Sequence, residues 1–515
     1  MPTAPHLSGA QNRLVAVAQN AGMGIGAQAF FLMLRFVTAV VITRTIGPKH
    51  YGTYVLAMSI IAVVEVIGLL GLEPAMIRFV AHYKALADIQ RVKSVLRIGL
   101  MATLIPTVFI SAWLYMFSPL AALHIFHNPD LTPVLRVMLL GAAPTSMMLV
   151  ILAALQGARL VKYKIAVQYL FSPFFRLIAV LAALGFGFSL IGVAWVWTLT
   201  AIAGFCLSLA FVSKHIGLLQ RPQNAVRSLD VLFFSLPLML SRVFSQNISI
   251  VGILLIGMFF KASDVGVYGV AMRTIPFLLV PLIAFNAILS PIFSELFTKG
   301  NMEELKSVYK VGNKWVISIT LPICVLMIHY ADVIASIFGA GFELSAQVMS
   351  IILVGQMVNA ASGSSALMLS MTGRPMFMLL NSAVVFILNI GLTLFLLVHI
   401  GITGAAYAYS IAVITIQCLQ LIEVWYLYKF HPYCLENIKA IIACAVSFAV
   451  LSYTMGLELP DSKNFHPMLS MLIFGSCYIL CLLLAGFSKE DRMIYYWFKS
   501  RFATVPPSGG NRLKE

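Results

Sequence analysis

Five charged side chains stand inside long apolar stretches of this 515-residue chain, where a charge is costly. Placing an arginine or a carboxylate at the centre of a bilayer costs at least about 2.5 kcal/mol, so such residues usually face a partner or a hydrated cavity. Four guanidiniums against one carboxylate make a cationic set, and an anionic substrate would account for it, because guanidiniums bind phosphate and carboxylate groups bidentately. The five residues are Arg35, Glu65, Arg176, Arg242 and Arg273.

A structural interpretation stands beside this one. Arg35 and Glu65 lie on consecutive apolar stretches at similar depth, and an ion pair between them would neutralise both. Arg242 and Arg273 have no carboxylate near them in sequence, which favours a hydrated cavity, whereas Arg176 stands among several phenylalanines. Glu65 is the one centrally placed carboxylate, so it is also a candidate for coupling transport to H⁺ or Na⁺. Both interpretations of Glu65 stay open at this stage.

The elements that must position these residues are membrane-spanning helices, because the chain contains fourteen apolar stretches of about 20 residues or more. Hydrophobic residues make up 61% of the sequence and charged residues 10%, with a mean hydropathy of +0.96, which excludes a soluble domain. We therefore expect an all-α integral membrane protein. The expected spans are residues 21–44, 51–73, 96–117, 133–155, 165–186, 190–213, 231–260, 265–291, 315–338, 346–371, 376–398, 404–428, 439–457 and 468–487.

Lysines and arginines predict the orientation. They fall almost entirely in every second gap between spans, and only Arg44, Lys49, Lys261 and Lys463 occupy the other gaps. The positive-inside rule therefore places both termini in the cytoplasm. This topology also explains the net charge of +16 without nucleic-acid binding, because no basic face with interleaved aromatic residues is present. We expect a multi-pass protein of the cell (inner) membrane whose first helix is an uncleaved insertion signal.

An internal repeat predicts how the helices are grouped. Residues 51–58 and 265–272 share Gly, Tyr, Ala and Met at an offset of 214, and Ile191–Trp195 resembles Thr403–Tyr407 at an offset of 212. Six helices per unit is an even number, so the two units share one orientation around an axis along the membrane normal, as in transporters. The expected parts are a six-helix bundle (1–213), a cytoplasmic linker (214–230), a second six-helix bundle (231–428), two additional helices (429–487) and a cytoplasmic tail (488–515).

A local motif carries a family resemblance. The stretch Arg44-Thr45-Ile46-Gly47-Pro48-Lys49-His50-Tyr51-Gly52-Thr53-Tyr54 resembles the pattern Arg-x-Leu-Gly-Pro-x-x-Tyr-Gly-x-Tyr of polysaccharide flippases, the Wzx-like polysaccharide transporter family. Ile46 replaces the usual leucine. The segment from Gly68 to Ala75, followed by Arg78, is similar to the family's second helix. The resemblance implies membership in the multidrug, oligosaccharidyl-lipid and polysaccharide exporter superfamily. The residues that match the motif are Arg44, Gly47, Pro48, Tyr51, Gly52 and Tyr54.

The resemblance also implies an activity. Such a flippase moves a polyprenyl-diphosphate-linked oligosaccharide from the cytoplasmic to the outer leaflet by alternating access, for cell-surface polysaccharide biosynthesis. The anionic headgroup of that lipid suits a cleft that contains Arg35, Arg176, Arg242 and Arg273. The implied partners are the lipid-linked glycan, the lipid bilayer, and a polysaccharide polymerase and chain-length regulator. Apart from H⁺ or Na⁺, no cofactor or metal is expected.

Two other functions remain as alternatives. A multidrug or cation antiporter of the same superfamily is the first, although cationic cargo would favour a cavity rich in carboxylates. A membrane glycan polymerase or ligase is the second, and such enzymes generally need catalytic carboxylates or a large external loop. The longest expected external loop, from Ser118 to Thr132, has only about 15 residues. We therefore expect no enzymatic activity and assign no catalytic residue.

Overall fold

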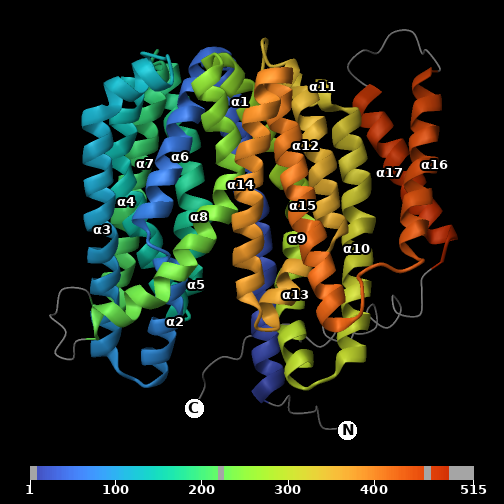
Figure 1. Ribbon diagram of the computed structural model, residues 1–515, viewed down its shortest axis with the longest axis horizontal. Helices are drawn as coiled ribbons and strands as arrows, with labels where there is room; N and C mark the ends of the chain where they lie inside the picture. Colours follow the sequence, from blue (N-terminus) through green and yellow to red (C-terminus); the bar gives the residue numbers. More distant parts are fainter. Residues whose placement is uncertain (1–8, 218–225, 457–465, 487–515) are drawn as a thin grey trace, which may run out of the picture.

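The computed structural model describes residues 9–217, 226–456 and 466–486, and every regular element in these ranges is a helix (Figure 1). The predicted tail and residues 218–225 of the predicted linker lie outside the described residues. The helices are α1 (Gly9–Gly68), α2 (Leu72–Ala85), α3 (Ile89–Leu120), η1 (Ala121–Ile125), α4 (Leu131–Gly157), α5 (Val161–Lys164), η2 (Ile165–Phe171), α6 (Ser172–Gly185), α7 (Leu190–His215), α8 (Ser228–Phe259), α9 (Ala262–Thr298), α10 (Met302–His329), α11 (Ala331–Ile337), α12 (Leu344–Ala361), α13 (Ser365–Met371), α14 (Pro375–Ile400), α15 (Ile402–Tyr428), α16 (Asn437–Gly456) and α17 (His466–Leu484).

The described residues contain eleven helical segments that are long and apolar enough to cross a membrane. The first of them holds two of the predicted helices, because the chain turns within α1 at Gly47, where φ is 74° and ψ is 175°. The shorter apolar helices α16 and α17 complete the set of fourteen. The predicted all-helical, multi-pass membrane fold is confirmed.

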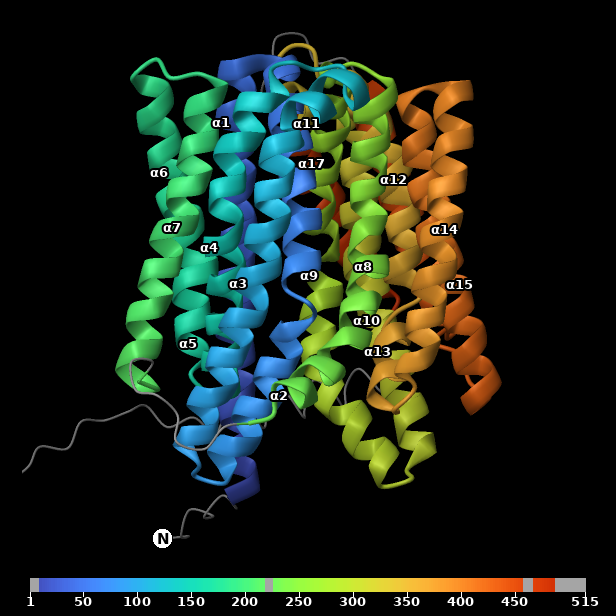
Figure 2. The ribbon, with the colours of Figure 1, turned by 60° about the vertical axis from the view of Figure 1, so that its left-hand side comes forward.

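The helices form two groups that lie side by side (Figure 2). Helices α1 to α7 make one group, which we call the first lobe, and α8 to α15 make the second lobe. Helices α16 and α17 lie at the outer edge of the second lobe, next to α10 (Figure 1). The Tyr478 hydroxyl on α17 donates a hydrogen bond of 2.8 Å to the Ser318 carbonyl on α10, which fixes this attachment.

The boundary between the lobes is a packed apolar core. Helices α1 and α9 run along it, and Tyr51 and Tyr268 are among the largest fully buried side chains. The Tyr51 ring also meets Phe342 of the second lobe edge-on, with 6.1 Å between the ring centroids. One cluster of buried apolar residues therefore spans both lobes.

Residues with positive φ interrupt two of the predicted helices. The predicted helix 51–73 ends at Gly68, because Leu70 and Gly71 have φ of 48° and 68°, and α2 begins after this break. The predicted helix 346–371 is divided into α12 and α13 beside Gly363, where φ is 68°. Left-handed residues end a helix without lowering the hydrophobicity of the segment, so the apolar pattern alone did not reveal either break.

A third departure lies in the predicted helix 165–186, which begins as the π-helix η2. Pro173 is the second residue after the end of η2. It has no amide hydrogen to donate to the carbonyl of Tyr169, so the α-helical hydrogen-bond ladder is interrupted there. The Ser172 hydroxyl donates instead to the carbonyl of Val167, at 2.8 Å. Short π-helical segments inside α-helices are rare and occur frequently at functional sites.

Candidate functional site

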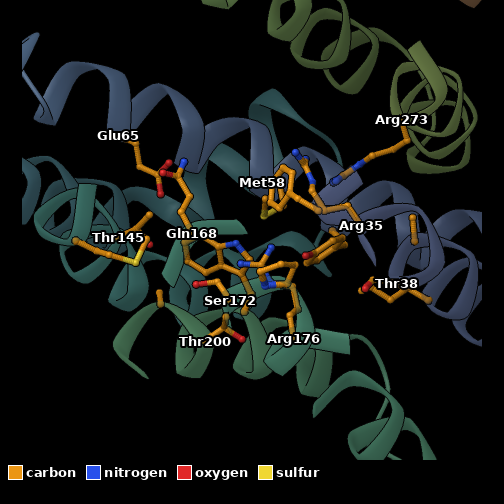
Figure 3. Close-up of a pocket in the computed structure, with 18 of the residues that line it drawn as sticks. Arg35, Thr38, Met58, Glu65, Thr145, Gln168, Ser172, Arg176, Thr200 and Arg273 are labelled. Carbon is orange, nitrogen blue, oxygen red and sulfur yellow. The ribbon is translucent and has the colours of Figure 1, made fainter. Parts of the chain in front are cut away.

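A cavity of about 240 Å³ lies inside the first lobe and reaches the lobe boundary (Figure 3). Helices α1, α4, α6, α7 and η2 form most of its wall, and α9 of the second lobe contributes Arg273. Three of the four predicted cationic residues line it, together with Glu65. The other labelled polar lining residues are Thr38, Thr145, Gln168, Ser172 and Thr200.

The three guanidiniums come from three helices. Arg35 is on α1 and lies over the ring of Phe31, with its guanidinium carbon 5.2 Å from the ring centroid. Arg176 is on α6, and its Nε is buried without a hydrogen-bond partner in the described part of the chain. Arg273 extends from α9 toward Arg35 (Figure 3). None of the ion pairs among the described residues includes any of the three, so their mutual repulsion favours an anion between them.

Glu65 lies at the other end of the cavity, near Gln168 (Figure 3). Its Oε1 is buried and accepts no hydrogen bond within the described residues. No ion pair between Arg35 and Glu65 is present there either, so the two residues do not neutralise each other in this structure. Glu65 therefore lines the cavity without an ion pair to any described cation.

Arg242 lies outside the cavity. Its Nη1 is 2.5 Å from Oε2 of Glu73 on α2, and the two side chains are 33% and 20% exposed. The prediction grouped Arg242 with the other arginines because it has no carboxylate near it in sequence, but Glu73 stands 169 positions earlier. The fold brings together Arg35, Arg176 and Arg273, whereas Arg242 joins the second lobe to the first.

Most of the residues that match the family motif lie at the lobe boundary. Arg44 Nε donates a hydrogen bond of 2.8 Å to the carbonyl of Ile337 in the second lobe. Pro48 packs against Gly341, where an added Cβ would lie 2.9 Å from the proline Cγ. Gly47 supplies the positive φ of the turn, and Gly52 contacts α9. These four residues thus position the two lobes relative to each other.

The remaining motif residues, Tyr51 and Tyr54, line the cavity. The Tyr51 hydroxyl is buried beside the Arg273 guanidinium and makes no hydrogen bond of good geometry to a described residue. Sequence reasoning assigned both tyrosines to the motif without a place in the cleft. The motif therefore connects the lobe boundary to the cavity wall.

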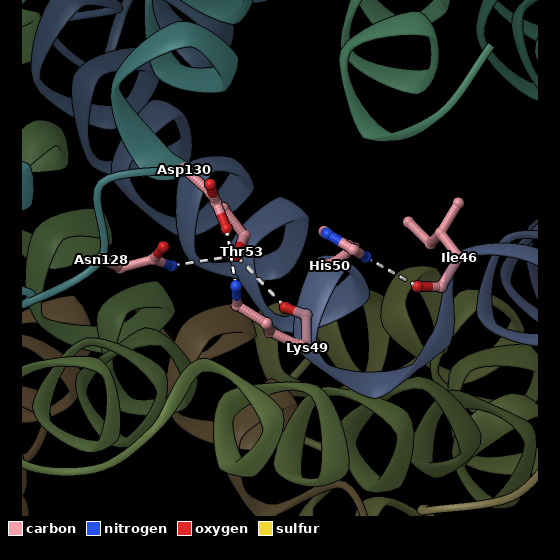
Figure 4. Close-up of polar contacts among 6 residues, drawn as sticks. All are labelled: Ile46, Lys49, His50, Thr53, Asn128 and Asp130. Carbon is pink, nitrogen blue, oxygen red and sulfur yellow. Dashed lines mark hydrogen bonds and ion pairs between the residues drawn. The ribbon is translucent and has the colours of Figure 1, made fainter.

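Polar contacts hold the turn of α1 on the first lobe (Figure 4). Lys49 Nζ is 2.9 Å from a carboxylate oxygen of Asp130, just before α4. Asn128 Nδ2 donates to the Thr53 hydroxyl at 2.9 Å, and that hydroxyl donates to the Lys49 carbonyl at 3.2 Å. The turn is therefore fixed to the loop before α4 on one side and to the second lobe on the other.

The stretch of chain that contains the motif also matches a known protein family. The profile of the family described as "Polysaccharide biosynthesis protein" matches residues 41–347, which is more than half of the sequence. The chain belongs to this family. The match includes the motif at residues 44–54 and confirms the resemblance that the motif indicated. No curated protein matches the chain.

Solved structures of membrane transporters share the fold of this protein. The structure titled "Lipid II flippase MurJ, inward closed conformation" has a TM-score of 0.72 and 15% identity, and the alignment covers 89% of this chain and 97% of that one. An inward-facing multidrug resistance MATE family transporter of the MOP superfamily has a TM-score of 0.70 and 15% identity, with coverage of 81% and 98%. An outward-facing MATE structure has a lower TM-score of 0.60, with 15% identity and coverage of 80% and 95%. At these identities the likeness shows the fold.

Proposed function

We propose that this protein is a flippase that moves a polyprenyl-diphosphate-linked oligosaccharide from the cytoplasmic to the outer leaflet. The observation that carries the proposal is the cavity that gathers Arg35, Arg176 and Arg273, none of which forms an ion pair with a described carboxylate. A diphosphate carries several acceptor oxygens, and guanidiniums bind such groups by bidentate, charge-assisted hydrogen bonds. The family's role in polysaccharide biosynthesis supports a glycan-bearing lipid as the cargo.

The size of the cavity limits what it holds. Pockets for drug-sized ligands have volumes of roughly 300–1,000 Å³, and this cavity has about 240 Å³. An oligosaccharide of several sugars would not fit. The cavity is therefore suited to the diphosphate and the part of the glycan next to it.

The distribution of the three arginines over the two lobes supports alternating access. Arg35 and Arg176 belong to the first lobe, whereas Arg273 belongs to the second. A change in the angle between the lobes would move Arg273 relative to the other two and so change the affinity for an anion. Binding and release of the headgroup are thereby coupled to the lobe motion that exposes each side in turn.

We place the protein in the cell (inner) membrane with both termini in the cytoplasm, on the basis of the lysine and arginine bias between the spans. In this orientation the cargo enters from the side where lipid-linked sugars are assembled. A polysaccharide polymerase and a chain-length regulator would act on the flipped product on the other side.

The leaflet distribution of lipid-linked oligosaccharide in cells depleted of the protein tests the proposal. Depletion is expected to leave intact glycolipid facing the cytoplasm, and the wild-type chain is expected to relieve this. Variants R35Q, R176Q and R273Q are each expected to fail, because a charge-assisted hydrogen bond contributes about 1.5 to 3 kcal/mol.

A matched control is available in Arg136, which also lies on a spanning helix but outside the cavity, with its Nε 3.0 Å from the Ser118 hydroxyl. R136Q is expected to transport normally. Normal glycolipid transfer in depleted cells would overturn the proposal and make export of a drug or cation the next assay. The neighbours titled multidrug transporters favour that alternative, and the arginines oppose cationic cargo.

A further inference from the structure

The cavity wall has two chemically different ends. Arg35 and Arg273 mark one end, and Glu65, Gln168 and Thr145 mark the other (Figure 3). Cationic donors dominate the first end, which the proposed function assigns to the diphosphate. The second end needs a separate explanation, because its side chains offer little to a phosphate.

Most hydroxyl groups on the neutral part of the cavity wall already donate to the backbone and cannot also donate to a ligand. The hydroxyls of Thr145, Ser172 and Thr200 each donate to a backbone carbonyl, at 2.9, 2.8 and 2.7 Å. Thr38 does the same, at 2.7 Å, so these side chains offer mainly their oxygen lone pairs to a ligand. The exceptions are the Gln168 amide nitrogen, which is itself a donor, and the Tyr51 hydroxyl, which lies beside the Arg273 guanidinium.

Gln168 adds a further acceptor, its side-chain oxygen, to which no group in the described part of the chain donates a hydrogen bond. Its Oε1 is buried and has no hydrogen-bond donor there. Leaving a buried acceptor unpaired costs about 1 to 3 kcal/mol, so such an atom is normally kept for a ligand or a bound water. The residue stands in the middle of η2, where the wider helical turn next to Pro173 sets the direction of its side chain.

Resting on the proposed function, we propose that Gln168 recognises the first sugar of the lipid-linked glycan by accepting a hydrogen bond from it. In a polyprenyl-diphosphate glycan the first sugar is bonded directly to the diphosphate, so it must lie beside the arginines that hold the phosphates. Sugar hydroxyls and acetamido N–H groups are donors, which complement a wall of acceptors. The cavity then discriminates among lipids by the sugar next to the phosphate.

Binding to the purified protein in nanodiscs tests this inference with two probes, polyprenyl diphosphate and the same lipid bearing one N-acetylhexosamine. Q168L is expected to weaken binding of the sugar-bearing probe about threefold to tenfold, since one neutral hydrogen bond is lost, and to change the sugar-free probe less than twofold. Q168E keeps an acceptor and is expected to recover part of the discrimination. R176Q is expected to weaken binding of both probes.

A matched substitution controls for folding. Gln347 is exposed at the start of α12 and does not line the cavity, so Q347L should bind both probes like the wild type. Q347L and Q168L should have the same melting temperature, which shows that Q168L is folded. Equal weakening of both probes by Q168L, or of neither, would overturn the sugar-reading role; the latter result would mean that a water satisfies the amide. If the wild type bound neither probe, the proposed function itself would be wrong and this inference with it.

Discussion

Gly52 and Gly266, which occupy equivalent positions in the two halves of the internal repeat, meet face to face where α1 crosses α9. A Cβ on Gly266 would lie 3.2 Å from the Gly52 nitrogen and 2.5 Å from the Pro48 carbonyl oxygen. One turn further on, Gly269 contacts Val55, which is again its counterpart at the same offset of 214. Equivalent residues touch only near the axis that relates two copies, so the pseudo-two-fold axis of the lobes passes between these helices.

This close approach predicts the effect of adding one methyl group. G52A would place a Cβ against the carbonyl of Ala262 and 2.8 Å from the Gly266 nitrogen, both backbone atoms that cannot rotate away. Overpacking of this kind typically costs 1–3 kcal/mol, so we expect a lower melting temperature in detergent and slower flipping. G391A is the matched control, because a Cβ at Gly391 on α14 would meet nothing within 4 Å. Equal melting temperatures for G52A and the wild type would show that the helices separate without cost.

The pair formed by Glu73 and Arg242 holds the lobes together at the other end of the molecule, where α2 meets α8 (Figure 2). We expect E73Q and R242Q each to lower the free energy of unfolding by about 1 to 3 kcal/mol, because a charged group loses its hydrogen-bonding partner. The double variant E73Q/R242Q should lose less than the sum of the two, and this non-additivity measures the contact. Additive losses in the double-mutant cycle would mean that the two side chains do not interact in the membrane.

The helices and the cationic cavity were largely predictable from the sequence, because both follow from the high cost of charge in a bilayer. Arg35, Arg176 and Arg273 had to point inward wherever the helices packed. The partner of Arg242 was not predictable, since the position of Glu73 depends on the break at Leu70 and Gly71. That break leaves the hydrophobic pattern unchanged.

Gln168 was missed for a different reason. An amide inside an apolar span is much less costly than a charge, so it draws no attention as a lone residue. Its exposure to the cavity also depends on η2, and a π-helix has no signature in a pattern analysed with a period of 3.6 residues. The proline at position 173 was the available signal, because it removes one helical hydrogen bond and permits the wider turn.

The geometry of the arginines in the cavity distinguishes arginine from lysine. R176K keeps the positive charge but replaces a planar fork of donors by a point charge, which cannot bind a diphosphate bidentately. We expect R176K to bind polyprenyl diphosphate more weakly than the wild type and more tightly than R176Q, with the loss for R176Q about tenfold to a hundredfold. Titration of the sugar-free probe measures this order. Full affinity in R176Q would remove Arg176 from the binding site.

The carboxyl group of Glu65, which forms no ion pair with another described residue, carries the last prediction, that transport is coupled to H⁺ or Na⁺ through this residue. A carboxylate that faces a cavity without a cation in contact can bind a proton or Na⁺ and release it when the lobes move. In proteoliposomes with an imposed H⁺ or Na⁺ gradient, E65Q is therefore expected to flip lipid at a rate that no longer responds to the gradient.

Two comparisons make the coupling test specific. Glu423 also lies on a spanning helix, but its Oε2 accepts a hydrogen bond of 2.8 Å from Asn381 and it does not line the cavity, so E423Q should keep the response. Q168L should also keep the response to the gradient but lose discrimination among sugars. E65Q should lose the response to the gradient but keep discrimination among sugars. A gradient response in E65Q equal to that of the wild type would end the coupling role and leave Glu65 as one more acceptor on the sugar side of the cavity.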